Sequence, residues 1–186
     1  YVAKELATLD VLSNGRAMLG IGVGWLKEEF DALGVPFESR AARTRESVEA
    51  IRALWRGDQK GFEGEFFKWG PVVSLPKPIQ KKGVPIVIGG HTQIAAKRAA
   101  RYCDGFFPGR GEKEVAALLV VMRKECERIK RDPREIEITM PLPGKDPAAF
   151  RRCVELGASR LIMPPPGFDA KTIDAGIAEL KPLLAA

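Results

Sequence analysis

Short apolar runs recur along the chain, separated by segments whose apolar residues are three or four positions apart. A run of four to eight apolar or small residues between turn residues is typical of a strand, buried or half-buried. On this basis the sequence predicts about five strands. They are Met18–Gly22, Pro85–Gly90, Asp104–Pro108, Ile136–Leu142 and Arg160–Met163.

The first residues of the chain predict a helix. Val2, Leu6, Leu9 and Leu12 have the spacing of an amphipathic helix, and the following Gly15 can take the left-handed conformation that ends one. No capping side chain precedes this helix, so we expect that sequence upstream of it is absent.

Further helices are predicted between the strands. Apolar stripes at helical spacing lie before Gly57, within 115–129 and within 173–184. Side chains suited to capping mark three helix starts, at Thr92, Asp146 and Asp169. Because strands and helices alternate, the predicted fold class is α/β, with parallel strands joined by crossover helices.

Residues 57–84 break this alternation. The stretch Phe62–Trp69, followed by Val72–Leu75, resembles a small hairpin inserted between the first two strands. Insertions of this kind usually surround the mouth of an α/β site. We interpret residues 1–186 as one partial domain that carries this insertion.

Composition excludes several functional classes. Thirty basic and 24 acidic residues give a net charge of +6, but the bases are scattered and not interleaved with aromatic residues, so we expect no nucleic-acid partner. The longest apolar run, Val115–Met122, is too short to cross a bilayer, and we expect no membrane association. Three cysteines without disulfide or metal-binding spacing suit a reducing cytoplasm, and no metal site is expected.

The turn after the second predicted strand is a candidate phosphate site. Gly89 and Gly90 remove side chains just before a predicted helix, whose first N–H groups lack partners, and His91 and Thr92 add donors. The alternative is a tight strand-to-helix turn capped by Thr92. We interpret His91, the only histidine, as a capping or hydrogen-bonding residue rather than a catalytic base.

A second candidate is the glycine run of the first strand. Gly20, Gly22 and Gly24 do not have the spacing of a dinucleotide fingerprint, and no acidic residue follows at the required distance. Alternating glycines suggest either a strand face against a flat ligand or close packing. Adjacent Glu28 and Glu29 cannot act as a catalytic dyad, and no known nucleophile or zinc motif is present, so the chemistry is expected to belong to a bound cofactor.

Several motifs together resemble one family. In chain order they are Ala3–Asp10, Leu12–Arg16, Leu19–Trp25, Glu28–Gly34, Phe62–Gly64, Pro76–Gln80, Ile88–His91 and Asp104–Phe106. They resemble the luciferase-like monooxygenases of the bacterial luciferase superfamily, and within it the group assigned to the deazaflavin coenzyme F-420. The resemblance implies a (β/α)8 TIM barrel, here incomplete and holding about the fourth to eighth strand–helix units.

The same resemblance implies the site residues. The cofactor phosphate is expected at Gly89, Gly90, His91 and Thr92, and the tricyclic ring beside Gly20, Gly22 and Gly24. Trp25 is expected to border the substrate. Three charged residues also match family positions and are interpreted as structural ion-pair or capping residues. They are Glu29, Arg40 and Asp104.

The implied function is an oxidoreductase that transfers a hydride between reduced coenzyme F-420 and a small organic substrate. One alternative is a monooxygenase that uses FMN and oxygen. Another is a truncated, non-catalytic paralogue that acts through association. Homodimers are common among proteins resembling this family, so a homodimer is an implied assembly.

Overall fold

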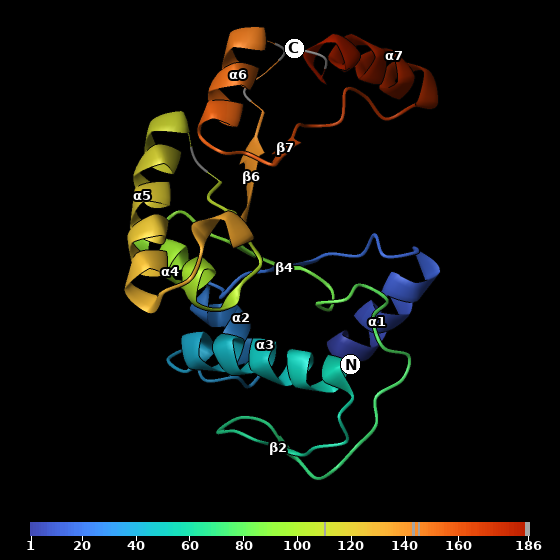
Figure 1. The fold of residues 1–186 in the computed structure, drawn as a ribbon, viewed down its shortest axis with the longest axis vertical. Helices are drawn as coiled ribbons and strands as arrows, with labels where there is room; N and C mark the ends of the chain where they lie inside the picture. The colour runs from blue at the N-terminus through green and yellow to red at the C-terminus, as the bar shows by residue number, and fades with distance from the viewer. Residues whose placement is uncertain (110, 143, 145, 185–186) are drawn as a thin grey trace. The chain divides into compact units, whose positions relative to one another are not determined.

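The computed structural model of the chain describes residues 1–109, 111–142, 144 and 146–184. The chain divides into two compact units, Tyr1–Ile88 and Gly89–Ala186. From residue 86 onward, strands and helices alternate along the chain (Figure 1). The interpretation of the chain as one domain stays a prediction.

The first unit contains two pairs of strands, one parallel and one antiparallel, together with three helices. The parallel strands β1 and β4 are in register, with Gly20 opposite Val87 and Ile21 opposite Ile88. The last residue of β4, Gly89, lies across the boundary between the units. The elements are α1 (Val2–Leu12), β1 (Leu19–Ile21), α2 (Lys27–Ala32), α3 (Arg40–Arg56), β2 (Phe62–Glu63), β3 (Lys68–Trp69) and β4 (Ile86–Gly89).

The second unit continues the alternation. Strand β5 pairs in parallel with β6, and β6 with β7. The helices α4 and α5 pack against each other, and the small side chains of Ala95, Ala96, Ala99 and Ala100 on α4 are buried. The elements are α4 (Gln93–Tyr102), β5 (Gly105–Phe107), α5 (Glu112–Ile129), η1 (Pro133–Glu135), β6 (Glu137–Pro141), α6 (Pro147–Glu155), β7 (Arg160–Ile162), α7 (Ala170–Leu180) and η2 (Lys181–Leu184).

The predicted fold class is confirmed. Each of the five predicted strands forms, as β1, β4, β5, β6 and β7, and each is followed by a helix. All the pairings described among them are parallel. Five such strands in the described residues are fewer than the eight of a closed (β/α)8 barrel.

The predicted helix starts are confirmed by their capping bonds. The Thr92 hydroxyl accepts a hydrogen bond from Ala95 N at 3.2 Å, and the Asp146 and Asp169 carboxylates accept from the first turns of α6 and α7. Helix α3 ends where predicted, because Gly57 adopts the left-handed conformation at its C-terminus.

Helix α1 is confirmed, but it buries a face other than its large apolar stripe. Ala3, Ala7 and Asp10 are buried, whereas Leu9 is 50% and Leu12 79% exposed. Small side chains let α1 approach α3, where the Trp55 indole N–H donates to the Ala3 carbonyl at 2.8 Å. The tertiary partner, and not the apolar spacing, decides which side of α1 is inside.

The predicted hairpin forms over part of its length. Strands β2 and β3 pair antiparallel, with Phe62 opposite Trp69 and their rings stacked at 4.8 Å between centroids. Val72–Leu75, in contrast, forms no strand. The turn is held by the buried carboxylate of Glu46 on α3, which accepts the N–H groups of residues 65–67.

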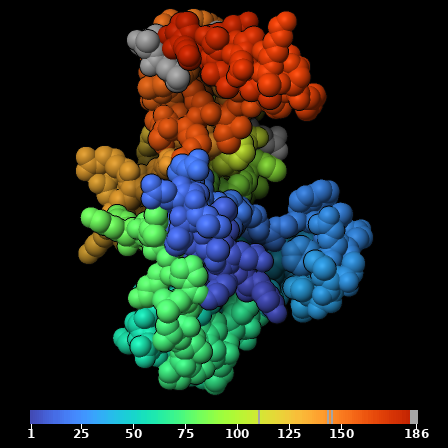
Figure 2. Space-filling model, turned by 90° about the vertical axis from the view of Figure 1, so that its right-hand side faces the viewer, coloured from blue at the N-terminus to red at the C-terminus, as the bar shows by residue number. Residues whose placement is uncertain are grey.

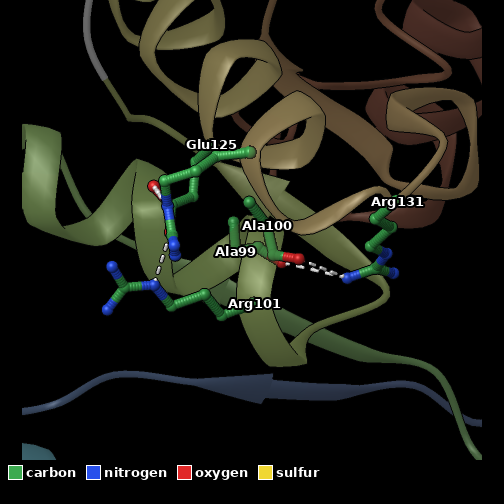
Figure 3. Close-up of polar contacts among 6 residues, drawn as sticks. Ala99, Ala100, Arg101, Glu125 and Arg131 are labelled. Carbon is green, nitrogen blue, oxygen red and sulfur yellow. Dashed lines mark hydrogen bonds and ion pairs between the residues drawn. The ribbon is translucent and has the colours of Figure 1, made fainter.

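A buried carboxylate also joins α4 to α5. Glu125 of α5 is 5% exposed and accepts from Arg101 Nε of α4 at 2.7 Å and from Arg128 Nη2 at 2.6 Å (Figure 3). These bonds from Arg128 and Arg101 lower the pKa of Glu125 to about 2, against the opposing effect of its burial. Arg131 donates to the Ala100 carbonyl at 2.8 Å, at the C-terminal end of α4.

We expect E125Q to lower the melting temperature by a few degrees at neutral pH, because the arginines lose their charged acceptor. Because the pKa of Glu125 is lower in the folded than in the unfolded protein, its charged carboxylate stabilises the fold at pH values above about 4.5. That contribution is lost as the pH falls toward about 2. The difference between E125Q and the unmodified protein should therefore shrink across this range. Thermal melts against pH measure it.

The matched control is E127Q, which removes the same charge from an exposed position on the same helix. An equal effect of E127Q at neutral pH, or a difference for E125Q that does not shrink in acid, would contradict the assignment.

Candidate functional site

The two glycine-rich candidates leave β1 and β4 at the same edge of the sheet. The strands are parallel and Ile21 lies opposite Ile88, so the chain continues into Gly22 from one strand and into Gly89 from its neighbour. The carboxyl ends of parallel strands are where α/β folds build their ligand sites. The register fixes the pairing of β1 with β4 up to Ile88, and the site that the sequence predicts beyond these strands stays a prediction.

The turn from β4 into α4 requires glycine at one position. Gly90 has a φ of +148°, and a Cβ there would lie 2.6 Å from the Cβ of Ala95. Its N–H donates to the Phe107 carbonyl at 3.1 Å, which fixes the peptide plane. A side chain at this position would therefore both strain the backbone and clash with α4.

The same turn offers donors to an anion. Thr92 caps α4, as one of the two interpretations of the sequence predicted. Within the described residues, however, the N–H groups of Gln93 and Ile94 have no acceptor. The Thr92 hydroxyl accepts the N–H of Ala95, and the N–H groups of Gln93 and Ile94 remain available at the positive end of the helix. Capping by Thr92 and binding of a phosphate are therefore compatible at the same turn.

His91 lies at a small hollow beside this turn. The side chain is exposed and lines a cavity of about 250 Å³ together with Gln93, Glu114 and Leu118. The capping bond belongs to Thr92, and His91 makes no hydrogen bond to the residues the structure describes. Its imidazole is therefore open to a ligand at this end of α4.

The glycines of the β1 segment differ in what surrounds them. A Cβ added at Gly20 or Gly22 would meet nothing within 4 Å. At Gly24, which has a φ of +83°, a Cβ would lie 2.6 Å from Cε2 of Phe30. Gly24 is thus explained by the turn and by Phe30, whereas the described residues do not pack against Gly20 or Gly22.

Trp25 follows this glycine run and is 83% exposed. It precedes Leu26, which occupies the N-cap position of α2. An exposed indole next to the carboxyl end of β1 is suited to contact a planar or apolar substrate. Its role in the substrate pocket stays a prediction.

The three charged residues expected to be structural have different surroundings. Glu29 is exposed in the first turn of α2. The guanidinium of Arg40 lies 3.6 Å above the centre of the Phe37 ring and donates to the Phe37 carbonyl at 2.8 Å. The Asp104 carbonyl accepts from Glu137 N beside β5. Arg40 is thus held by a ring and a carbonyl.

Asp10, which the sequence did not single out as a site residue, positions the segment that leads into β4. Asp10 is fully buried, and its carboxylate accepts from Ile79 N at 2.9 Å, Gln80 N at 3.1 Å and Gln80 Nε2 at 2.7 Å. Figure 2 shows the segment before β4 lying against the N-terminal segment. The sequence signal for this role was the position of Asp10 next to Leu9, in the apolar stripe of α1.

The described residues contain no helix long and apolar enough to cross a membrane. Nor do they contain a group of three histidine, cysteine or acidic side chains placed to hold a metal ion.

Comparison with known proteins identifies the family. The model of the luciferase-like monooxygenase family matches residues 1–144. The chain belongs to this family. Family members include oxidoreductases and monooxygenases, and both kinds occur among the relatives of the chain.

Two curated relatives differ in their cofactor. The chain is 31% identical over 147 residues to an F-420-dependent glucose-6-phosphate dehydrogenase of Amycolatopsis mediterranei. The aligned region covers 76% of this chain and 44% of that protein. It is 34% identical over 108 residues to an FMNH2-dependent dimethylsulfone monooxygenase of Pseudomonas putida, covering 56% of this chain and 30% of that protein.

A solved structure supports the fold. The monooxygenase RslO1 from Streptomyces bottropensis matches with a TM-score of 0.66 and 26% identity, over 99% of this chain and 56% of that one. The chain spans 65% of the length of the curated relatives that match nearly all of it.

The contrast between Gly90 and Gly22 gives a direct test of the turn. We expect G90A to destabilise the protein by roughly 1–3 kcal/mol, because the new Cβ meets Ala95 and the φ is unfavourable. G22A adds the same methyl group in open space and should change stability by less than about 0.5 kcal/mol. Denaturant unfolding of both variants measures this, and equal losses would contradict it.

Proposed function

We propose that the chain forms part of an oxidoreductase in which reduced coenzyme F-420 exchanges a hydride with a small organic substrate. The observation that carries the proposal is the turn after β4, where Gly90 is required and where two N–H groups have no acceptor among the residues that the structure describes. A phosphate of the cofactor fits such a turn, because it accepts both bonds and carries the charge that the helix N-terminus favours.

The residues of the chain have separate parts in this proposal. Gln93 and Ile94 hold the phosphate through their N–H groups, and Thr92 fixes the first turn of α4 that presents them. Gly20 and Gly22 leave room for a flat ring along β1. Trp25 covers the substrate and excludes water from it.

When bound, the deazaflavin supplies two-electron hydride chemistry, and the protein contributes distance and orientation. No acid or base is assigned to the chain. The net charge of +6 favours the more acidic F-420 over FMN. The match to the F-420-dependent relative also covers 76% of this chain, whereas the match to the FMNH2-dependent relative covers 56%.

An FMN-dependent monooxygenase is the second candidate, and the 34% identity to the dimethylsulfone monooxygenase supports it. The N–H groups at the start of α4 would bind a terminal phosphate as well as a phosphodiester.

A non-catalytic paralogue that acts by association is the third. We keep a homodimer and a cytoplasmic location within the proposal; the buried free thiols of Cys103, Cys126 and Cys153 suit a reducing compartment.

Competition between the cofactors separates these candidates. We expect the fluorescence of coenzyme F-420 to change saturably on addition of the protein, and FMN to displace it only at higher concentration. Displacement of F-420 by a lower concentration of FMN would favour the monooxygenase. The absence of saturable binding by either cofactor would overturn both candidates in favour of the non-catalytic paralogue.

A substitution in β1 tests the ring position. We expect G20V to weaken cofactor binding by at least about tenfold, because its branched side chain would fill the space assigned to the ring. We expect the protein to stay folded, with an unfolding free energy within about 1 kcal/mol of the unmodified protein, because a Cβ at Gly20 meets no atom within 4 Å and valine favours strands.

The matched control is G70V, because Gly70 also has open space around its Cβ position and lies in the same unit, beside β3. Binding that is unchanged in G20V, or weakened equally in G70V, would overturn the assignment of the ring to β1.

A further inference from the structure

A hollow lined by five basic side chains lies within the first unit. Its volume is about 440 Å³. The last turns of α3 form one side and the segment 77–83 forms the other. We call it the basic pocket, and its charged residues are Arg52, Arg56, Lys77, Lys81 and Lys82.

The walls of the basic pocket are fixed by buried groups. Trp55 lines it, is 6% exposed and is held by its bond to the Ala3 carbonyl. Gly83 has a φ of +85°, and a Cβ there would lie 3.0 Å from Cε3 of Trp55, so the chain passes close to the indole. Asp10 fixes the neighbouring Ile79 and Gln80 through their N–H groups.

Local interactions account for only part of the positive charge. Arg56 Nε lies 3.6 Å from the Asp58 carboxylate. Lys77 lies over Gly57, at the C-terminus of α3, where a cation is favourable. In the part of the chain that the structure describes, the side chains of Lys81 and Lys82 have no hydrogen-bonding or ion-pair partner, and no acidic residue lines the pocket.

We propose that the basic pocket binds a phosphorylated small molecule. Its volume is within the range of small-molecule sites, and clustered cations of one sign are stabilised by a multivalent anion. Pro78 and Ile79 add apolar surface for the organic part of such a ligand, and Ile79 is 49% exposed. The combination fits a phosphate ester better than an inorganic ion.

The basic pocket is a second site and not an extension of the turn at Gly90. Lys81 and Lys82 precede β4, whereas Gly90 and His91 follow it. All the residues that line the basic pocket belong to the first unit, whereas Gly90 and His91 belong to the second. The proposal does not depend on which cofactor the protein uses.

Inorganic pyrophosphate is the probe that tests this assignment, because it carries the charge of a phosphate ester without the organic group. We expect saturable binding by calorimetry at low salt. The double variant K81Q/K82Q should bind at least about tenfold more weakly, since charge-assisted bonds are lost.

The control is K124Q/K171Q, which removes the same charge from exposed positions in the second unit. It should bind pyrophosphate as the unmodified protein does. Equal weakening in both double variants would show a general charge effect and overturn the proposal, as would binding that does not saturate.

A second readout locates the bound anion. The indole N–H signal of Trp55 in an NMR spectrum, assigned with W55F, should shift during the titration, because Trp55 lines the pocket. The amide signals of Gln93 and Ile94, whose N–H groups are the proposed donors to the cofactor phosphate, report separately on anion binding at the α4 turn. Movement of these amides without movement of Trp55 would assign the anion to the α4 turn and overturn the proposal.

Discussion

The parallel pairing of β1 with β4 is the constraint on which the candidate site depends. Because Ile21 lies opposite Ile88, the two glycine segments leave the sheet at one edge. A shift of one residue would reverse the face of every side chain on the strand. Asp10 supports this register by fixing the residues that lead into β4, about seventy positions along the chain.

Three buried carboxylates fix the parts of the chain that lack regular pairing. Asp10 and Glu46 each accept backbone N–H groups from a distant segment, and Glu125 accepts guanidinium groups. Burying a carboxylate is unfavourable unless its charge is met by donors, so each acid requires the segment that it binds to stay in place. Helices α1, α3 and α5 in this way determine the course of loops and of a neighbouring helix.

The strands and helix starts could be predicted because their signals are local. An apolar run between turn residues marks β4, and the hydroxyl of Thr92 is enough to mark the start of α4. The buried face of α1 could not be predicted, because it depends on where α3 approaches. Residues 72–75 have strand-like side chains but no partner strand in the described structure.

The same limit applied within the candidate site. The sequence treated the three glycines of the β1 segment as equivalent, and only the position of Phe30 separates Gly24 from Gly20 and Gly22. Likewise, Lys81 and Lys82 belong to the scattered bases of the sequence, and only the fold brings Arg52 and Arg56 of α3 beside them. Spacing along the chain identifies candidates, but tertiary neighbours decide what each one does.

The open space beside Gly20 makes that position suitable for chemical labelling. The Cβ of a cysteine placed there would have no atom within 4 Å, while the native thiols at 103, 126 and 153 are buried and protected from reagents. A spin label or fluorophore could thus be attached to the middle of β1 alone. Such a reporter would sense the polarity and motion around strand β1.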